Sequence, residues 1–187
     1  VCGGSFVPEE RNDHGAVREM TLAENALLSG YGRRGLVKLG MVDMKRIAAF
    51  AGEVIKRFDV RTTGPKAEAR SLSGGNLQKF IVGREIRQAP KLMIAAQPTW
   101  GVDVGAAAQI RQALIDLRDA GVAVLVVSEE LDELFEICDR LAVIAQGRLA
   151  DARPTRDTNA EEIGLLMAGS FIAAGTESGR RLSPAGA

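Results

Sequence analysis

The residues best suited to chemistry form one short stretch, 71–79, which reads Ser-Leu-Ser-Gly-Gly-Asn-Leu-Gln-Lys. Ser73, Gly74 and Gly75 lead directly into a predicted helix. Glycines let the backbone come close to a bound group, and the first amides of a helix have no partner within it. The helix dipole adds partial positive charge at the same end. The stretch therefore predicts an anion site, with a phosphate as the expected anion. The alternative is a glycine-rich helix start that binds nothing.

The overall composition limits the classes of partner. The 187 residues are 46% hydrophobic and 26% charged, which is typical of a globular chain of one domain or a little more. Basic and acidic residues number 24 each, so we expect no nucleic acid as partner. Aromatic residues make up only 4%, which argues against base stacking. No apolar run approaches the ~18 residues of a membrane span, so any membrane role must come through a partner.

Two cysteines and one histidine are the remaining reactive side chains. Cys2 and Cys138 lie far apart in the sequence. They are able to pair, but two reduced thiols in a cytosolic protein are the favoured interpretation. His14 lies in a predicted loop without a cysteine or carboxylate at metal-ligand spacing. We therefore expect a solvated histidine rather than a ligand or a catalytic base, and we predict no metal site.

The first half of the chain is predicted to be mostly helical. A short strand ends before Pro8, and Thr21 with Glu24 forms a capping box for a helix that ends near Leu28. Residues 29–40 contain four glycines and are expected to form a loop. Asp43 is expected to cap a second helix, and a third, the helix of the 71–79 stretch, runs from about 75 to 87. The second helix has one apolar stripe: Ile47, Phe50, Ala51, Val54, Ile55 and Phe58. Residues 21–90 are therefore predicted to be a helical unit without strands.

The second half alternates strands and helices. Residues 91–96 and 123–127 are apolar runs, the pattern of strands buried on both faces of a parallel sheet. Amphipathic helices are expected at 105–120, at 131–138 with Cys138 in the core, and at 160–167. A further strand at 141–145 turns into a short fourth one, and 171–187 is predicted to be a flexible tail. This order predicts an α/β fold with right-handed crossovers.

Four landmarks together resemble those of a known family. Residues 72–78 resemble the signature motif of ABC transporters, Leu-Ser-Gly-Gly-Gln in its commonest form. Then follow, in the family's order, an apolar strand ending at 97–99, the Gly-Val-Asp-Val-Gly run at 101–105, and Ser-Glu-Glu-Leu at 128–131 with Asp139 to Val143 beyond it. The chain thus resembles an ABC-transporter nucleotide-binding domain over roughly residues 5–150. Residues 7–11, Glu24-Asn25 and the 101–105 run are similar to the second of two fused ATPase domains in importers of simple sugars and nucleosides.

The resemblance implies a fold with one part missing. The family's P-loop, G-x-x-x-x-G-K-[ST], does not occur in this sequence. Val1 is not an initiator methionine, and no signal peptide follows it. We therefore expect an α/β, P-loop NTPase-like parallel sheet that lacks its N-terminal P-loop portion, plus an α-helical subdomain. Residues 1–20 would be a remnant of the ATPase core, 21–90 the helical subdomain with the signature, 91–170 the C-terminal part of the core, and 171–187 the tail.

Three positions depart from what the family needs for catalysis. The family's Walker B strand ends in Asp, which binds Mg²⁺, and Glu, which activates water, but this chain has Ala96 and Gln97. Alanine has no oxygen for a hard cation, and glutamine is a poor proton acceptor. The family's switch histidine falls at Glu129, whose carboxylate would repel a phosphate. We therefore expect no intact catalytic residue, and these positions to be structurally occupied but chemically silent.

In the family, two domains pair head to tail, and each ATP lies between the P-loop of one domain and the signature of the other. The resemblance implies that this chain contributes its signature to such a shared site, with ATP as cofactor and Mg²⁺ held mainly by the partner domain. The nucleotide-binding residues would be Leu72, Ser73, Gly74, Gly75, Asn76 and Gln78. Gly101 and Asp103 would form the D-loop at the domain interface, although Asp103 is equally suited to cap the 105–120 helix. Trp100 stands where the subclass more often has arginine.

The implied function is an energy-coupling, ATP-binding component of an importer of simple sugars or nucleosides. It would act as an ATPase only in the full transporter, and the fragment alone is expected to be inactive. Its partners would be a second ABC ATPase domain, membrane permease subunits and, indirectly, an extracytoplasmic solute-binding protein. It would lie in the cytoplasm, on the inner face of the membrane. A non-transport ABC ATPase or a regulatory pseudo-ATPase that acts as a binding module is the alternative. A Rossmann-type dehydrogenase is disfavoured because no G-x-G-x-x-G follows a strand.

Overall fold

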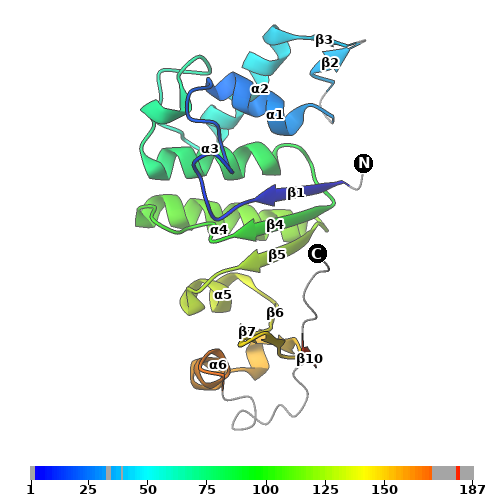
Figure 1. Cartoon of the computed structure of the whole chain (residues 1–187), viewed down its shortest axis with the longest axis vertical. Coiled ribbons are helices and arrows are strands. Elements are labelled where there is room, and N and C mark those ends of the chain that lie inside the picture. The colour runs from blue at the N-terminus through cyan, green and yellow to red at the C-terminus, as the bar shows by residue number, and fades with distance from the viewer. Residues whose placement is uncertain (1–2, 33–34, 39, 170–179, 182–187) are drawn as a thin grey trace. The chain divides into compact units, whose positions relative to one another are not determined.

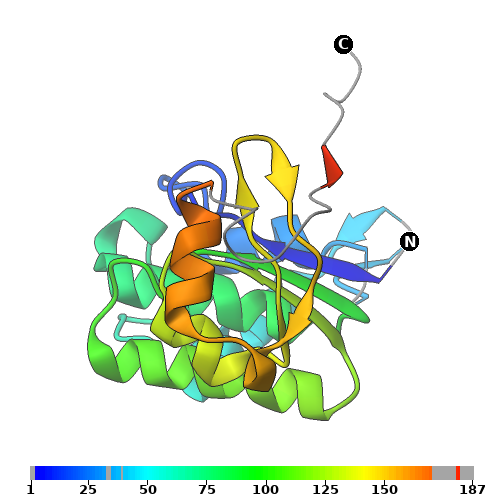
Figure 2. The same cartoon turned by 90° about the horizontal axis from the view of Figure 1, so that it is seen from below.

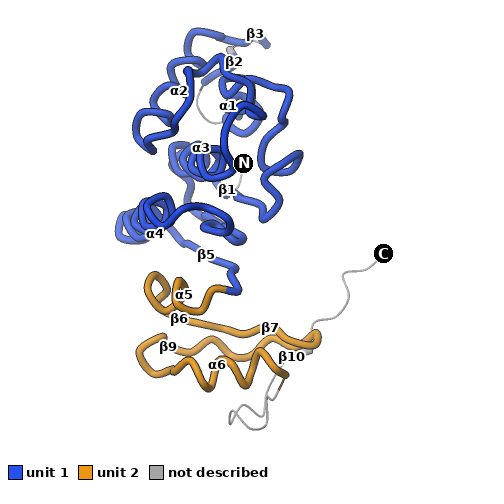
Figure 3. Tube along the Cα trace, turned by 90° about the vertical axis from the view of Figure 1, so that its left-hand side faces the viewer, with its two compact units in different colours: residues 1–129 blue, residues 130–187 orange. Residues whose placement is uncertain are grey.

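Two compact parts make up the computed structural model, unit 1 (Val1–Glu129) and unit 2 (Glu130–Ala187), and each is described by itself (Figure 3). The structure describes residues 3–32, 35–38, 40–169 and 180–181. The flexible tail predicted for 171–187 lies outside the described residues, apart from 180 and 181. The division of the chain at residues 20, 90 and 170 stays a prediction.

A three-stranded parallel sheet forms the base of unit 1 (Figure 1). Its strands are β1 (Gly4–Val7), β4 (Leu92–Ala96) and β5 (Ala123–Val127), in the order β1-β4-β5. In the register, Phe6 pairs with Ile94, and Ile94 pairs with Leu125. Parallel neighbours joined through helices confirm the predicted α/β fold class.

Two helices cover one face of this sheet (Figure 2). Helix α3 (Gly74–Ile86) packs against β1, and α4 (Val104–Asp119) packs against β5 and α3. The side chains that point to the helices are buried: Ser5, Val7, Met93 and Ala95. Helices α3 and α4, and the loops that precede them, therefore form one layer on this face of the sheet.

The opposite face of the sheet is apolar and exposed. Phe6 is 55% exposed, Leu92 40%, Leu125 52% and Val127 49%. The prediction that residues 91–96 and 123–127 are buried on both faces is therefore wrong within the described part of the chain. Because strand side chains alternate between faces, the apolar run shows only that both faces lack polar groups. It does not show that both are covered.

Helices α1 (Leu22–Gly30) and α2 (Met44–Arg57) pack on each other and on α3. The capping box of Thr21 and Glu24 is present, and the Asp43 carboxylate accepts from the Arg46 N–H at 3.1 Å, so both predicted helix starts are confirmed. A Cβ at Gly83 of α3 would clash with the ring of Phe58, so this glycine permits the close approach of the end of α2. A short 3₁₀ turn, Ala69–Ser71, leads into the signature.

The segment between α1 and α2 is more regular than the loop that the sequence predicts. Strands β2 (Val37–Lys38) and β3 (Met41–Val42) pair as a short antiparallel hairpin. The expectation that residues 21–90 contain no strands is therefore wrong at this point. Gly40, between the two strands, has a φ of +78°, which a tight hairpin turn requires. A glycine-rich segment is compatible with either a hairpin or an irregular loop, so the sequence alone does not decide between them.

Unit 2 contains helices α5 (Leu131–Ile137) and α6 (Ala160–Met167) with short antiparallel strands. These are β6 (Arg140–Leu141), β7 (Ile144–Ala145), β8 (Arg148–Leu149), β9 (Arg153–Pro154) and β10 (Arg180–Arg181), with a 3₁₀ turn at Thr155–Asp157. The strand predicted at 141–145 is split, because β6 pairs with β9 whereas β7 pairs with β8. The core of unit 2 is Leu141, Val143, Ala150, Ile163 and Leu166, and Cys138 packs against it half-buried.

Candidate functional site

Ser73 is the N-cap of α3, and its hydroxyl is held from behind by Asn76. The Ser73 Oγ accepts from the Asn76 Nδ2 at 2.9 Å and from the Asn76 backbone N–H at 3.5 Å. The Asn76 Oδ1 in turn accepts from the Arg61 N–H at 2.8 Å, which fixes the orientation of the amide. Both contacts use the oxygen of Ser73 as acceptor, so its hydrogen is available to donate outward. Ser73 and Gly74 are exposed, whereas Leu72, Gly75 and Asn76 are half-buried.

Gln78 lies on the inner side of α3. Its side chain is 1% exposed, and its Nε2 donates to the Pro98 carbonyl at 2.9 Å. The next residue, Lys79, donates from Nζ to the Asp59 carbonyl. These contacts attach the first turns of α3 to the loop after β4 and to the segment after α2. Gln78 therefore faces the protein, and any effect it has on a ligand is indirect.

The other end of α3 is anchored by a buried ion pair. Arg84 and Glu85 are each 5% exposed, and the Arg84 Nε donates to the Glu85 Oε1 at 2.9 Å. The Arg84 guanidinium also donates to the carbonyls of Asn25 (3.1 Å) and Gly15 (2.8 Å). Burial lowers the pKa of Arg84 from its usual value, and the adjacent Glu85 opposes that shift. Because the guanidinium has several partners, α3 is held to α1 and to the loop after β1.

Asp103 is the N-cap of α4, as the sequence predicts. Its Oδ1 accepts from the Ala106 N–H at 2.9 Å, at the start of α4. This hydrogen bond holds the pKa of Asp103 below its usual range, and the positive charge of Lys79 adds to the effect. A Cβ at Gly75 would lie 3.7 Å from the Asp103 Oδ2. The signature and the 101–105 loop are therefore side by side, as the starts of two adjacent helices.

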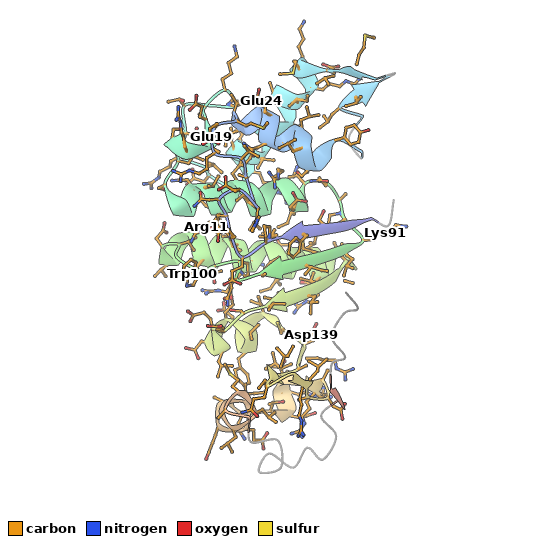
Figure 4. The ribbon with its side chains drawn as sticks, in the orientation of Figure 1. Arg11, Glu19, Glu24, Lys91, Trp100 and Asp139 are labelled. Carbon is orange, nitrogen blue, oxygen red and sulfur yellow. The ribbon has the colours of Figure 1, made fainter. Side chains whose placement is uncertain are left out.

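Arg11, on the loop after β1, joins the same group of residues (Figure 4). Its Nη2 donates to the Trp100 carbonyl at 2.9 Å, and its guanidinium carbon lies 5.6 Å from the centroid of the Trp100 ring. A hollow of about 1020 Å³ lies between residues 8–14, the start of α3 and Trp100, and the exposed His14 is on its wall. In the sequence, Arg11 stands out only as part of the 7–11 run, because its partner Trp100 is 89 residues away along the chain.

The three positions that depart from the family pattern lie at one end of the sheet. Ala96 ends β4 half-buried, and Gln97 follows with a φ of +45°. The Gln97 N–H donates to the Val127 carbonyl at 2.7 Å, and its Oε1 accepts from the Ser128 Oγ and the Glu129 N–H, both at 3.4 Å. Gln97 and Glu129 are therefore adjacent, joined by a side-chain cap on the turn after β5.

The described residues lack two kinds of feature. They contain no group of three or more His, Cys, Asp or Glu side chains arranged to hold a metal ion. Among the helices described in unit 1 and unit 2, none has the length and apolar character needed to span a membrane.

The chain is similar in sequence to several import ATP-binding proteins. The chain is 46% identical over 166 residues to the nucleoside import ATP-binding protein NupA of Lactococcus lactis subsp. cremoris, covering 89% of this chain and 33% of that protein. It is 45% identical over 168 residues to the guanosine import ATP-binding protein NupO of Bacillus subtilis, covering 90% and 33%. The ribose import ATP-binding protein RbsA of Bacillus subtilis is 36% identical over 167 residues, covering 89% and 34%. No protein-family model matches the chain.

Solved structures show the fold. The post-hydrolysis dimer of the ATP-binding cassette MJ0796 bound to ADP and Pi matches with a TM-score of 0.68 at 22% identity, over 82% of this chain and 63% of that one. A putative metal-chelate type ABC transporter in an inward-facing conformation matches with a TM-score of 0.69 at 19% identity, over 89% and 63%. The chain is therefore homologous to the ABC-transporter ATP-binding domains of nucleoside and ribose importers, and it spans about a third of the length of those relatives.

Proposed function

We propose that this chain contributes the signature motif to an ATP site whose nucleotide is held by a second ATPase domain, in an importer of nucleosides or simple sugars. The observation that carries the proposal is the Ser73 hydroxyl, which lies on an exposed residue at the start of α3 and whose oxygen accepts from the Asn76 amide, leaving its hydrogen available to donate. The names of the similar proteins support the solute class.

The site would bind phosphate through hydrogen bonds and partial charge. The Ser73 hydroxyl donates to the γ-phosphate, and the first amides of α3, at Gly74 and Gly75, complete the cradle. Asn76 acts by orienting Ser73, since its amide lies between that hydroxyl and the Arg61 N–H. Gln78 acts through the Pro98 carbonyl, and Asp103 through the start of α4.

Hydrolysis would belong to the partner domain. The side chain of Ala96 offers no oxygen to Mg²⁺. The Gln97 amide oxygen already accepts two hydrogen bonds from the turn at Ser128 and Glu129, and an amide is not a general base at neutral pH. Glu129 is exposed and would place a negative charge where the family has its switch histidine. We therefore propose that the complete importer has one hydrolytic site, completed by this signature, and one impaired site.

The remaining partners follow from that role. The importer would contain permease subunits, with residues 21–90 as the part that contacts them, and an extracytoplasmic solute-binding protein that delivers the solute to the permease. The chain would then lie in the cytoplasm against the inner face of the membrane. Co-purification with a polytopic permease distinguishes this function from a non-transport ABC ATPase or a regulatory pseudo-ATPase.

The test is a charge introduced at the signature of the assembled importer. Ser73→Arg removes the phosphate donor and fills the space of the γ-phosphate, so the ATPase rate should fall about 100-fold or more. Gln109→Arg adds the same side chain at an exposed position of α4 and serves as the control. An ATPase rate in Ser73→Arg equal to that of the control would refute the proposal.

A further inference from the structure

Arg11 occupies the space between the two glycine-bearing loops of the site. A Cβ built on Gly74, at the start of α3, would lie 2.8 Å from the Arg11 Nη1. A Cβ built on Gly101, in the loop before α4, would lie 2.7 Å from the Arg11 Nη2. Both distances are too short for real contacts, so each glycine leaves room for the guanidinium. Gly101 also has a φ of +63°, which disfavours a side chain there independently.

The same guanidinium fixes Trp100. It donates to the Trp100 carbonyl at 2.9 Å and lies within cation–π range of the indole ring, at 5.6 Å from the centroid. One planar group thus contacts the backbone and the ring of the same residue. Lysine has neither the fork nor the flat face for both contacts. The Trp100 side chain is otherwise open, with 60% of its surface exposed.

From these contacts we infer that Arg11 is a positioning residue for the signature. It links the loop after β1 to the start of α3 and to the loop before α4, and so sets the distance between Ser73 and the 101–105 loop. The inference rests on the function proposed above. Because Arg11 acts on the signature and not on the domain that holds the nucleotide, its loss should lower kcat of the assembled importer and leave KM for ATP unchanged.

A spectroscopic readout is available because Trp100 is the only tryptophan of the chain. In the 187-residue chain, Arg11→Ala removes both contacts to Trp100. The emission maximum and the acrylamide quenching of Trp100 should therefore both change. Arg70→Ala, at an exposed arginine paired with Glu68, should leave both unchanged. Gly74→Ala should alter the emission in the presence of Arg11 and have no further effect in the Arg11→Ala background, because its added methyl group then meets no side chain.

Activity of the assembled importer gives the second readout. We expect kcat to fall by roughly 10-fold in Arg11→Ala, since small misplacements in a site are costly, with KM unchanged. Arg11→Lys retains the positive charge and is expected to fold, and its kcat should fall less than that of Arg11→Ala. It therefore serves as the test if Arg11→Ala does not fold. Unchanged emission in Arg11→Ala, or changed emission with unchanged kcat, would overturn the positioning role. Neither outcome changes the result expected for Ser73→Arg, so the proposed function would still stand. If the proposed function is wrong, Ser73→Arg will keep the ATPase rate of its control, whatever the Arg11 variants show.

Discussion

At the residue scale, Ser73 both caps a helix and presents a hydroxyl to solvent. A lone N-cap serine uses its oxygen for the helix, and its hydrogen is free to turn. Here the Asn76 Nδ2 at 2.9 Å occupies a second lone pair, which restricts where the hydrogen can point. We therefore propose that Asn76, in place of the family's commoner glutamine, orients Ser73, because its short side chain reaches back to the serine.

Asn76→Asp separates the helix cap from this orienting role. The carboxylate keeps an acceptor for the Arg61 N–H and favours the positive end of α3, so the thermal unfolding midpoint of the chain should be unchanged or higher. It loses the donor to Ser73 and adds a negative charge beside the phosphate site. The ATPase rate of the assembled importer should fall by roughly 10- to 100-fold. Equal rates for Asn76→Asp and the parent would show that Asn76 does not orient Ser73.

The local signals at this scale were readable from the sequence. Thr21 with Glu24, Asp43 and Asp103 cap helices through partners within three residues, and such short-range chemistry is visible in a single sequence. The contacts of Arg11 were not predictable, because they depend on how distant loops meet in the fold. The burial of Gln78 was likewise not predictable, since its partner Pro98 lies in the loop after β4.

At the scale of elements, α3 carries the site at one end and a buried ion pair at the other. Its first turns are attached to neighbouring segments by Gln78 and Lys79, and its last turn is anchored by Arg84 and Glu85. The Arg84 guanidinium reaches both α1 and the loop after β1, so it connects α3 with α1 and with the loop that carries Arg11. A rigid helix is a better support for a phosphate donor than a loop.

Arg84→Met tests this anchor. Removing the cation leaves the Glu85 carboxylate buried without its charge partner, and the free energy of unfolding should fall by about 3–5 kcal/mol. Arg70→Met breaks an exposed pair and should cost no more than about 1 kcal/mol. The double variant Arg84→Met with Glu85→Gln should be more stable than Arg84→Met alone. Denaturant unfolding measures all three, and a loss in Arg84→Met no larger than in Arg70→Met would contradict the anchor.

The elements themselves were mostly predictable, and the exceptions have physical causes. The amphipathic helices at 44–57 and 104–119 follow their apolar stripes closely. The hairpin at 37–42 and the split of the 141–145 strand depend on which neighbour each short segment pairs with. An apolar run such as 92–96 specifies a strand, but only the tertiary structure determines that one of its faces stays open.

At the scale of the molecule, the chain presents Ser73 at the start of α3 and, where β4 and β5 end, three side chains that we propose to be catalytically silent. The chain matches a solved ATP-binding cassette over 82% of its own length and 63% of that chain, and it spans about a third of its importer relatives. Ser73 is held by Asn76 at the start of α3, whereas Ala96 and Gln97 stand at the end of β4 without a carboxylate. The central claim is therefore that this chain completes a nucleotide site without holding the nucleotide itself.

Calorimetric titration of the 187-residue chain with MgATP tests that claim most directly. A signature alone offers a few hydrogen bonds and partial charge, with no P-loop and no Mg²⁺ ligand at Ala96. We therefore expect no saturable heat, which corresponds to a Kd weaker than about 1 mM, and no ATP hydrolysis. The assembled importer, titrated in parallel, should bind MgATP. A micromolar Kd for the chain alone would contradict the account, because the nucleotide would then be held by residues of this chain.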